Sequence, residues 1–447
     1  MLVYLDNAST TKPCEAAIAA SLDALSACYG NPSSAHTLGQ EAERLVKRSR
    51  ADIAALLGAR EGQLVFTGSG TESDNIAFHS VFKNPARISG RRLIISGIEH
   101  PAVARPAAYY AEQGAELAVM PVSTTGMVDT EAIEDALGTA AAAQRTSLIS
   151  VMHVNSEIGT IQPIAEIAHV KDRINKRYGA AIALHTDAVQ SFGKLPIMAG
   201  QGAADAGSAG HGVPGAADAG SRLYSDFSGV DLISISAHKI HGPKGVGALY
   251  AKRPEKLGAL IRGGGQEGGH RSGTENTAGI AGFAAAANDI RVSGDDGLIA
   301  STESDTGQSA AHRVAGLRAR LLQGIKDAIA DVRINSPEKA SADGEPGCCS
   351  PYILNVSFLG ARGEVILHEL EGQGVFVSTG SACSNLGKKG GASKMDHTLA
   401  AIGLRLKEAE GALRFSLSRY STEQEIDHAL EHLTAAVKRI RSIGAYR

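Results

Sequence analysis

The chain has 447 residues, of which 44 are Lys or Arg and 47 are Asp or Glu, giving a formal net charge of −3. This length is enough for two or three domains of roughly 150 residues each, and the nearly neutral balance gives no electrostatic reason to expect a nucleic acid or an anionic membrane as a partner. Tryptophan is absent and aromatic residues make up 4% of the chain, which argues against a surface for stacking bases.

The N-terminal sequence MLVYLDNAST has neither the basic segment nor the apolar segment of a secretory signal. No later stretch has the roughly 20 uninterrupted apolar residues that a membrane-spanning helix requires. From these two observations we expect a cytoplasmic protein with no membrane partner.

From about residue 40 the chain alternates between helical and strand-like patterns. Residues 40–58 (QEAERLVKRSRADIAALLG) place their apolar positions on one stripe of a helix, with Gly58 as its stop. The segment QLVFTGSG is a short buried strand that ends in glycines, and the helix-like TESDNIAFHSVF follows it. Further β-rich runs lie at 91–100, 115–122, 146–159, 181–191 and 231–239.

This alternation predicts an α/β fold with a largely parallel sheet covered by helices on both faces. In such sheets ligands bind at the carboxyl ends of the strands. Two polar segments cannot bury a core: 199–228, which contains the near repeat GAADAG, is expected to be a flexible surface insertion, and 292–310 a linker. The predicted division is a large domain at 14–291 and a small α+β domain made of 1–13 and 311–447.

An anion site is indicated where a predicted strand passes into a helix in FTGSGTESDN. Gly68, Gly70 and Thr71 open that helix, and backbone N–H groups with a hydroxyl at a helix N-terminus bind a phosphate. Thr71 with Glu72 also fits an ordinary helix start. The glycine-rich 262–276 lacks the GK[ST] of a nucleotide loop, and its Arg271, Ser272 and Thr274 are candidate anion donors.

Two polar residues lie near the ends of β-rich runs. His100 ends LIISGIEH, where it could stack on a ring or move protons, or be an ordinary strand-end histidine. Asp187 lies in the apolar run LHTDAVQS, and a buried carboxylate requires a partner such as a protonated pyridine, unless it caps the next helix. Gln190 follows three residues later.

Lys239 ends the run DLISISAHK, and the chain then reverses through HGPKG into a second apolar run. It is either a solvated lysine at a strand end or a partly desolvated amine that condenses with a carbonyl. A metal site is not supported, because the spacing of the candidate ligands matches no helical metal motif. Those candidates are His185, Asp187, His238 and His241.

The five cysteines are scattered and form no CxxC pair, so we expect reduced thiols rather than a disulfide framework or a zinc site. Cys383 lies in STGSACSNLGKKGGAS, a composition typical of a mobile loop that carries a reactive thiol, and Lys388 and Lys389 favour its thiolate. The alternative is a small buried cysteine. Cys348 and Cys349 precede a predicted strand and have no partners that indicate a site.

Several of these segments together resemble one family. YLDNAST, GNPSSAH, FTGSGTESDN, EHPAV, MHVNSEIG, HTDAVQSFGKLPI, SAHKIHGPKGVGALY, RSGTEN and STGSACSN occur in the order found in cysteine desulfurases of the nitrogen-fixation and iron–sulfur-cluster type. These belong to the class V aminotransferase group of fold-type I enzymes that use pyridoxal phosphate. The resemblance covers nearly the whole chain apart from the two polar segments, and it implies a seven-stranded type of sheet in the large domain.

The resemblance implies a role for each matching position. Lys239 would form the Schiff base with pyridoxal 5′-phosphate, Cys383 would attack the substrate's sulfur, and His100 would stack on the ring and assist proton transfer. Asn155 and Arg414 would bind the substrate. The residues that would hold the cofactor are Gly70, Thr71, His100, Ser156, Asp187, Gln190, Ser236, His238, Lys239 and Thr274, the last reaching the neighbouring subunit of a homodimer.

The implied reaction converts L-cysteine to L-alanine and leaves the sulfur on Cys383 as a persulfide. Sulfur-acceptor or scaffold proteins would then take it for iron–sulfur cluster assembly or other thiolation. One position departs from the family pattern: Ser156 replaces the second of two adjacent asparagines, which hydrogen-bonds the cofactor's ring oxygen. Losing that bond would raise the activation barrier by about 1 kcal/mol, which lowers the rate a few-fold.

Three alternatives remain open on the sequence. A selenocysteine lyase would use the same residues. Another class V enzyme, such as a transaminase or a kynureninase-like hydrolase, would not need Cys383. A non-catalytic binding partner that keeps the fold is made conceivable by Ser156, but the intact Lys239, Asp187, His100 and Arg414 argue against it.

Overall fold

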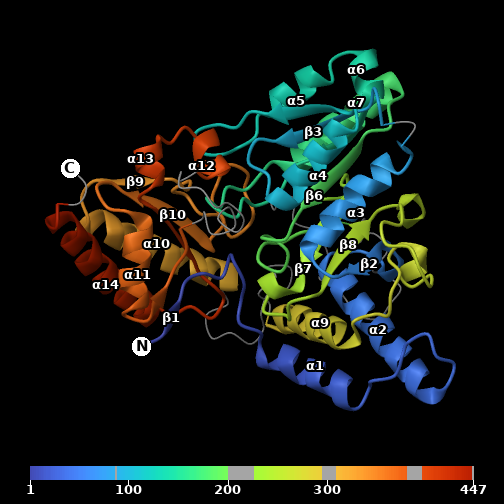
Figure 1. Cartoon of the computed structure of the whole chain (residues 1–447), viewed down its shortest axis with the longest axis horizontal. Coiled ribbons are helices and arrows are strands. Elements are labelled where there is room, and N and C mark those ends of the chain that lie inside the picture. Colours follow the sequence, from blue (N-terminus) through green and yellow to red (C-terminus); the bar gives the residue numbers. More distant parts are fainter. Residues whose placement is uncertain (86–87, 200–225, 294–308, 380–394, 445–447) are drawn as a thin grey trace, which may run out of the picture.

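The computed structural model of the chain has a larger and a smaller lobe, and both chain ends lie in the smaller one (Figure 1). The larger lobe contains the elements from α1 (Glu15–Ser26) to α9 (Thr277–Val292). The smaller contains β1 (Val3–Tyr4) and the elements from α10 (Ala310–Ala328) onward. The structure describes residues 1–85, 88–199, 226–293, 309–379 and 395–444.

A seven-stranded sheet runs through the larger lobe in the order β2-β8-β7-β6-β5-β3-β4. The strands from β7 to β4 in that order are parallel, whereas β8 is antiparallel to both β2 and β7. The predicted α/β fold with a mainly parallel sheet is therefore confirmed. The strands are β2 (Leu64–Thr67), β3 (Arg92–Ser96), β4 (Glu116–Met120), β5 (Thr146–Ser150), β6 (Ala183–Asp187), β7 (Leu232–Ser236) and β8 (Gly247–Ala251).

Both faces of this sheet are buried. Successive residues of a strand point to opposite faces, and in β3 Leu93 and Ile95 pack with Phe78 of α3 in one hydrophobic cluster. Ile94, between them, packs in another cluster with Ile167 of α7. The helices of this lobe also include α2 (Thr37–Leu56), α3 (Gly70–Phe82), α4 (Pro101–Glu112), α5 (Thr130–Ala136), α6 (Ala140–Arg145) and α7 (Ile164–Tyr178).

Two helix ends follow directly from the local sequence. Helix α2 starts a few residues earlier than its apolar stripe predicted because His36 accepts a hydrogen bond from Gly39 N as its N-cap. It ends before Gly58, whose φ of 61° lies in the left-handed region that glycine adopts easily. Helix α3 begins after Ser69, which accepts a hydrogen bond from Glu72 N.

The smaller lobe has its own core around a three-stranded sheet, β12-β10-β9. Strand β1 pairs in parallel with β11, so the N-terminal Val3 and Leu5 pack in the same cluster as Val356 and Phe415. The remaining elements are β9 (Val332–Ile334), β10 (Ile353–Phe358), β11 (Val375–Phe376), β12 (Ala412–Ser416), α11 (Gly363–Glu371), α12 (His397–Ala401), α13 (Leu406–Ala409) and α14 (Glu423–Ser442).

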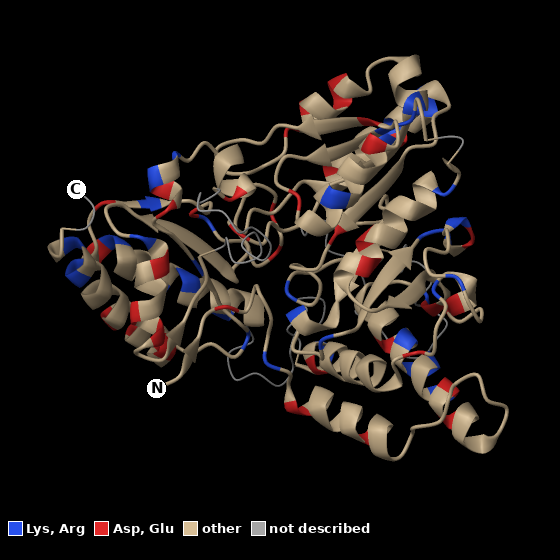
Figure 2. Cartoon of the chain, viewed as in Figure 1, with Lys and Arg blue, Asp and Glu red and all other residues tan. Residues whose placement is uncertain are grey.

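The domain boundaries at 14, 291 and 311 stay a prediction. Most of the polar segments 199–228 and 292–310 lies outside the described residues, so their expected flexibility also stays a prediction. None of the described helices is long and apolar enough to cross a membrane. The helices of each lobe contain both basic and acidic residues (Figure 2).

Candidate active site

Lys239 lies just beyond the carboxyl end of β7, in the short 3₁₀ helix Ala237–Lys239. Its Nζ donates hydrogen bonds to Ala8 O at 2.5 Å and Ser9 O at 2.7 Å, so the N-terminal segment from the smaller lobe reaches the lysine. The chain then reverses and β8 pairs back on β7, with Ser236 opposite Gly247. The predicted reversal is confirmed, and the amine of the half-buried lysine is held by two backbone carbonyls.

Asp187 is the last residue of β6, beside β7, and it is buried. Its Oδ1 accepts a hydrogen bond from Val189 N at 2.9 Å. Burial, together with the negative charge of Asp74, raises the pKa of Asp187 to about 6. A cation bound against this carboxylate would lower its pKa again and so keep it ionised.

His100 is the N-cap of α4, where its Nδ1 accepts a hydrogen bond from Ala102 N at 3.1 Å. This bond leaves the proton of the neutral ring on Nε2. Burial lowers the pKa of His100, although the nearby negative charge of Asp187 opposes the shift. His100 is therefore a neutral imidazole in the electrostatic neighbourhood of Asp187 and Lys239.

The N-terminus of α3 and the end of β7 form a cradle of the kind that a phosphate requires. A Cβ placed on Gly70 would lie 2.6 Å from Val189 Cγ2 and 3.5 Å from Ser236 Cβ, so only glycine lets these segments approach so closely. Ser236 is buried, and its Oγ has no hydrogen-bond partner among the described residues. Exposed Thr71 follows Gly70 in the first turn.

An unsatisfied buried hydroxyl beside a helix N-terminus fits an anionic oxygen of a bound group. The buried Asp187 fits a protonated ring nitrogen, and Lys239 supplies the amine. The anion site at the start of α3, Asp187 and Lys239 were each predicted near a strand end, and with the Ser236 hydroxyl they match the groups that pyridoxal phosphate requires.

His238 and Thr274 are the other expected phosphate contacts. His238 Nδ1 pairs with Thr10 Oγ1 at 3.1 Å, and burial with the charge of Lys239 lowers the pKa of His238 to about 3, so the ring is neutral. Thr274 is exposed and lines a surface pocket with Gly68. Arg271, a candidate anion donor in the same loop, instead pairs with Glu72, from Nε to Oε1 at 2.8 Å.

Gln190 is buried, and its Nε2 donates to Ala8 O at 2.8 Å, the oxygen that also accepts from Lys239. The structure thus brings Gln190 to the lysine, as expected. Its Oε1 accepts a hydrogen bond from Lys194 Nζ at 3.2 Å. The sequence analysis gave Lys194 no role, although it lies within the segment HTDAVQSFGKLPI.

The side chain of Asn155 is used within the protein. Its Oδ1 accepts from Glu157 N at 2.9 Å and Ile158 N at 3.0 Å, and its Nδ2 donates to Ile98 O at 3.0 Å. These bonds shape the turn that follows β5. Ser156 is half-buried in that turn, and its backbone oxygen accepts from Arg414 Nη1 at 3.1 Å.

Arg414 lies in β12 of the smaller lobe and is buried. Its guanidinium donates to Glu157 Oε1 at 2.8 Å, to Asp6 Oδ1 at 3.0 Å and to Ser9 Oγ at 2.7 Å. Burial raises the pKa of Glu157 to about 7, although Arg414 opposes the shift. Asp6 and Glu157 lie in two of the quoted segments, but nothing local in the sequence indicated that both would pair with this arginine.

The metal alternative finds no support in the described part of the chain, where no group of three or more His, Cys, Asp or Glu residues could hold an ion. His185 is instead bonded through both ring nitrogens, Nδ1 to Ser150 Oγ at 2.8 Å and Nε2 to Ser234 Oγ at 3.0 Å. Cys349 is buried, and burial raises the pKa of its thiol. Cys383, with Lys388 and Lys389, lies outside the described residues.

Comparisons with known proteins agree over the full length of the chain. The family model described as aminotransferase class-V matches residues 3–211 and 219–429. A cysteine desulfurase IscS from Dictyoglomus turgidum is 36% identical over 445 residues, covering 100% of this chain and 97% of that protein. A cysteine desulfurase IscS 1 from Archaeoglobus fulgidus is 35% identical, covering 99% and 98%.

Solved structures of similar proteins include a NifS-like protein, 31% identical with a TM-score of 0.78, covering 98% of this chain and 100% of that one. A protein named SspA, solved in complex with cysteine, is 27% identical with a TM-score of 0.69, covering 94% of this chain and 100% of that chain.

Proposed function

We infer that this chain, which belongs to the aminotransferase class-V family, is a pyridoxal phosphate-dependent cysteine desulfurase. The inference is carried by the meeting of Lys239, buried Asp187 and the unsatisfied Ser236 hydroxyl at the ends of two adjacent strands. The similarity to cysteine desulfurases over the whole chain supports L-cysteine as the substrate.

We assign the cofactor contacts by chemistry. The N-terminus of α3 with Ser236 and His238 would hold the phosphate, Asp187 would keep the ring nitrogen protonated, and Gln190 would donate to the phenolic oxygen. His100 would stack on the ring. When bound, pyridoxal phosphate supplies an electron sink for the negative charge that develops at the substrate's α-carbon. The full proposed set is Gly70, Thr71, His100, Ser156, Asp187, Gln190, Ser236, His238, Lys239 and Thr274.

Lys239 would remove the α-proton of cysteine, because its amine would be released beside the α-carbon when the substrate takes its place on the cofactor. His100 presents Nε2–H on the opposite nitrogen from its helix cap, which suits it to hand a proton to or from the reacting atoms. Its low basicity keeps it a neutral donor, so it does not compete with Lys239 for the α-proton.

Arg414 binds the carboxylate of cysteine, a task for which a planar guanidinium is suited. Because Glu157 and Asp6 already pair with it, the substrate's carboxylate must displace or rearrange one of them. Asn155 contributes by holding the turn that carries Ser156 O and Glu157 to the arginine. This is a narrower role than direct contact with the substrate.

Cys383 completes the reaction, and this assignment is supported by the sequence resemblance alone. Its thiolate attacks the sulfur of the substrate, an S–S bond forms and the C–S bond breaks. The electron pair of that bond returns to the three-carbon skeleton, which is protonated and leaves as alanine. The sulfur remains on Cys383 for an acceptor or scaffold protein, as in the delivery of sulfur to iron–sulfur cluster assembly.

A homodimer is supported by two observations. Thr274 is exposed, as a residue that completes a partner's phosphate site must be. Helix α1 also exposes large apolar side chains, including Leu22 at 59% and Leu25 at 65% exposure, and such a surface on a single chain indicates an interface. The mass of the purified protein in solution tests this assignment.

The decisive experiment measures sulfide and alanine released from L-cysteine with a reductant. We expect both products from the wild type, and neither from Cys383→Ala, although that variant keeps the yellow colour of the bound cofactor. Lys239→Ala should lose colour and activity together. A colourless wild type would overturn the cofactor assignment, whereas a yellow Cys383→Ala that still releases both products would overturn the role of Cys383. Comparing the rates on L-cysteine and L-selenocysteine separates the desulfurase from a lyase.

A further inference from the structure

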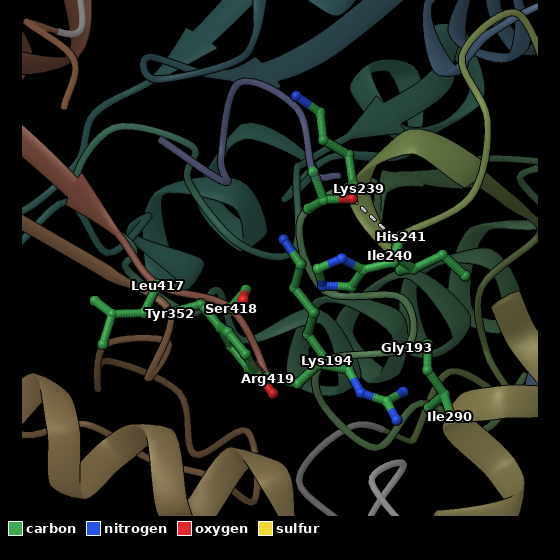
Figure 3. Close-up of a pocket in the computed structure, with 11 residues that line it drawn as sticks. Gly193, Lys194, Lys239, Ile240, His241, Ile290, Tyr352, Leu417, Ser418 and Arg419 are labelled. Carbon is green, nitrogen blue, oxygen red and sulfur yellow. Dashed lines mark hydrogen bonds between the residues drawn. The ribbon is translucent and has the colours of Figure 1, made fainter. Parts of the chain in front are cut away.

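A buried lysine, Lys194, lies next to the site without an assigned task. It lines the same small pocket as Lys239 and Tyr352 (Figure 3), and only 7% of its surface is exposed. Within the described part of the chain no carboxylate lies within 4.0 Å of its Nζ. The Tyr352 ring centroid is 5.8 Å from that nitrogen.

The electrostatic position of this amine is unfavourable. Burial lowers the pKa of Lys194 to about 7, and the positive charges of Lys239 and Arg414 add to the shift. A buried amine without an acidic partner destabilises a fold. Its burial therefore requires a compensating contact, and Lys194 Nζ donates a hydrogen bond to Gln190 Oε1 at 3.2 Å.

That contact fixes which way round the Gln190 amide lies. The carbonyl of Ala8 can only accept, so it selects the NH₂ end of the amide, at 2.8 Å. Lys194 donates N–H groups whether it is charged or neutral, so it selects the carbonyl end. The two partners lie at opposite ends of the amide and favour the same orientation.

The selected orientation has a direct chemical consequence at Lys239. Gln190 Nε2 and Lys239 Nζ both donate to Ala8 O, so the two nitrogens converge on one oxygen. One N–H of the amide is used there, and the other is left for a group attached at Lys239. If the amide were reversed, its oxygen would face both Ala8 O and any anionic oxygen of that group.

We propose that Lys194 is a positioning residue that locks the Gln190 amide with an N–H facing the phenolic oxygen of the cofactor bound at Lys239. The proposal rests on the proposed function. Ser156 stands where the family has a second donor to that oxygen, so Gln190 carries more of the task in this chain. Lys194 itself does not touch the cofactor.

The readout is the pH midpoint of the visible absorbance of the lysine-bound cofactor, which reports its protonation. A donor to the phenolic oxygen stabilises the deprotonated form and lowers that midpoint. Lys194→Met, which keeps the side-chain volume, should raise the midpoint by roughly half a unit to one unit, the value of one hydrogen bond. Gln190→Ala should raise it as much, and the double variant no further than Gln190→Ala alone.

Lys171→Met is the matched control, because Lys171 is a buried residue of α7 that does not line this pocket and bonds instead to Gly229 O and Asp231, just before β7. It should lower stability and leave the midpoint unchanged. Lys194→Arg, which keeps a donor, should restore most of the wild-type midpoint. If Lys194→Met does not fold, Lys194→Leu replaces it, alone and combined with Gln190→Ala. The affinity of the cofactor-free protein for pyridoxal phosphate gives a second readout.

Two results would overturn the proposal. If the midpoint of Lys194→Met equals that of the wild type, the orientation of the Gln190 amide does not depend on Lys194. A shift that persists in full on the Gln190→Ala background would show that Lys194 acts by its charge alone. In both cases the proposed function is unaffected as long as the wild type is yellow and active. A wild type that binds no cofactor would instead contradict the proposed function itself.

Discussion

At the scale of single residues, the buried carboxylates show how stability and function oppose each other. Asp187 has a folded-state pKa of about 6, above the roughly 3.9 of an unfolded aspartate. The folded protein without cofactor therefore binds more protons than the unfolded chain between those two values. Its stability falls as the pH rises through that window and stays lowered above it.

Replacing Asp187 by Asn should therefore stabilise the cofactor-free protein. We expect the free energy of unfolding at about pH 8 to rise by roughly 3 kcal/mol, and the gain to vanish below about pH 3, where the carboxyl is almost entirely neutral in both states. The charge of Asp74 contributes to the same shift and His185 opposes it. Urea unfolding of both proteins over this pH range measures the difference, and a destabilised variant at about pH 8 contradicts it.

The same substitution should cost the enzyme its activity. Without the carboxylate the ring nitrogen has no anionic partner, and breaking such a buried pair is worth about 3 kcal/mol or more. Alanine release from L-cysteine should fall by at least about 100-fold. Activity within a few-fold of the wild type would show that Asp187 is not the partner of the ring.

At the scale of elements, the site depends on how closely α3 approaches the ends of β6 and β7. Gly70 is the contact point, since a Cβ there would meet Val189 Cγ2 at 2.6 Å, and Val189 follows β6 by two residues. The first turn of α3 is thereby held next to Ser236. The proposed anion site depends on this packing, because it brings the helix start that the sequence indicated next to the hydroxyl of Ser236.

Gly70→Ala should weaken cofactor binding as well as destabilise the fold. The added methyl pushes α3 from the strand ends, which costs about 1–3 kcal/mol as overpacking and moves the phosphate donors. We expect the dissociation constant of pyridoxal phosphate to rise at least about tenfold. Gly62→Ala is the matched control because its Cβ would meet no atom within 4 Å. Equal affinities for the wild type and Gly70→Ala would contradict the cradle.

At the scale of the whole molecule, the site is assembled from both lobes. Arg414 comes from β12 and Asp6 from the N-terminal segment of the smaller lobe, whereas Glu157 and Lys239 come from the larger one. The polar segment 199–228 begins and ends away from this site. Met198 and Asp226, near its two ends, form a β-bridge. Ala199 O accepts a hydrogen bond from the hydroxyl of Tyr250, whose strand partner is Ile233 near the start of β7.

Deleting residues 200–225 should therefore leave turnover unchanged. The ends of the deletion, joined by a short glycine linker, already lie side by side, and Lys239 follows the opposite end of β7. Phe227 must be retained because it packs edge-on against His153, with ring centroids 4.8 Å apart. The rate of alanine release by the deletion variant tests this, and a loss of more than a few-fold would assign the segment a part in the reaction.

Strand and helix patterns were sufficient to predict the parallel sheet, the reversal after Lys239, and the placement of Asp187 at a strand end. Each depends on apolar periodicity and turn residues that lie within about a dozen positions of one another. The family resemblance then supplied roles for positions such as Gln190 and Arg414. The cysteine chemistry of Cys383 rests on the same source.

Other features depend on contacts between residues far apart in the chain, which local patterns do not encode. Arg414 meets Asp6 across 408 positions, and Gln190 meets Ala8 across 182. Asn155 with Glu157, and Lys194 with Gln190, are only two and four positions apart, yet the use of these side chains also depends on which buried donors find acceptors once the chain is packed. Hydrogen-bond satisfaction in the folded core decided these roles, since every buried polar group competes there for the partners that packing leaves within reach.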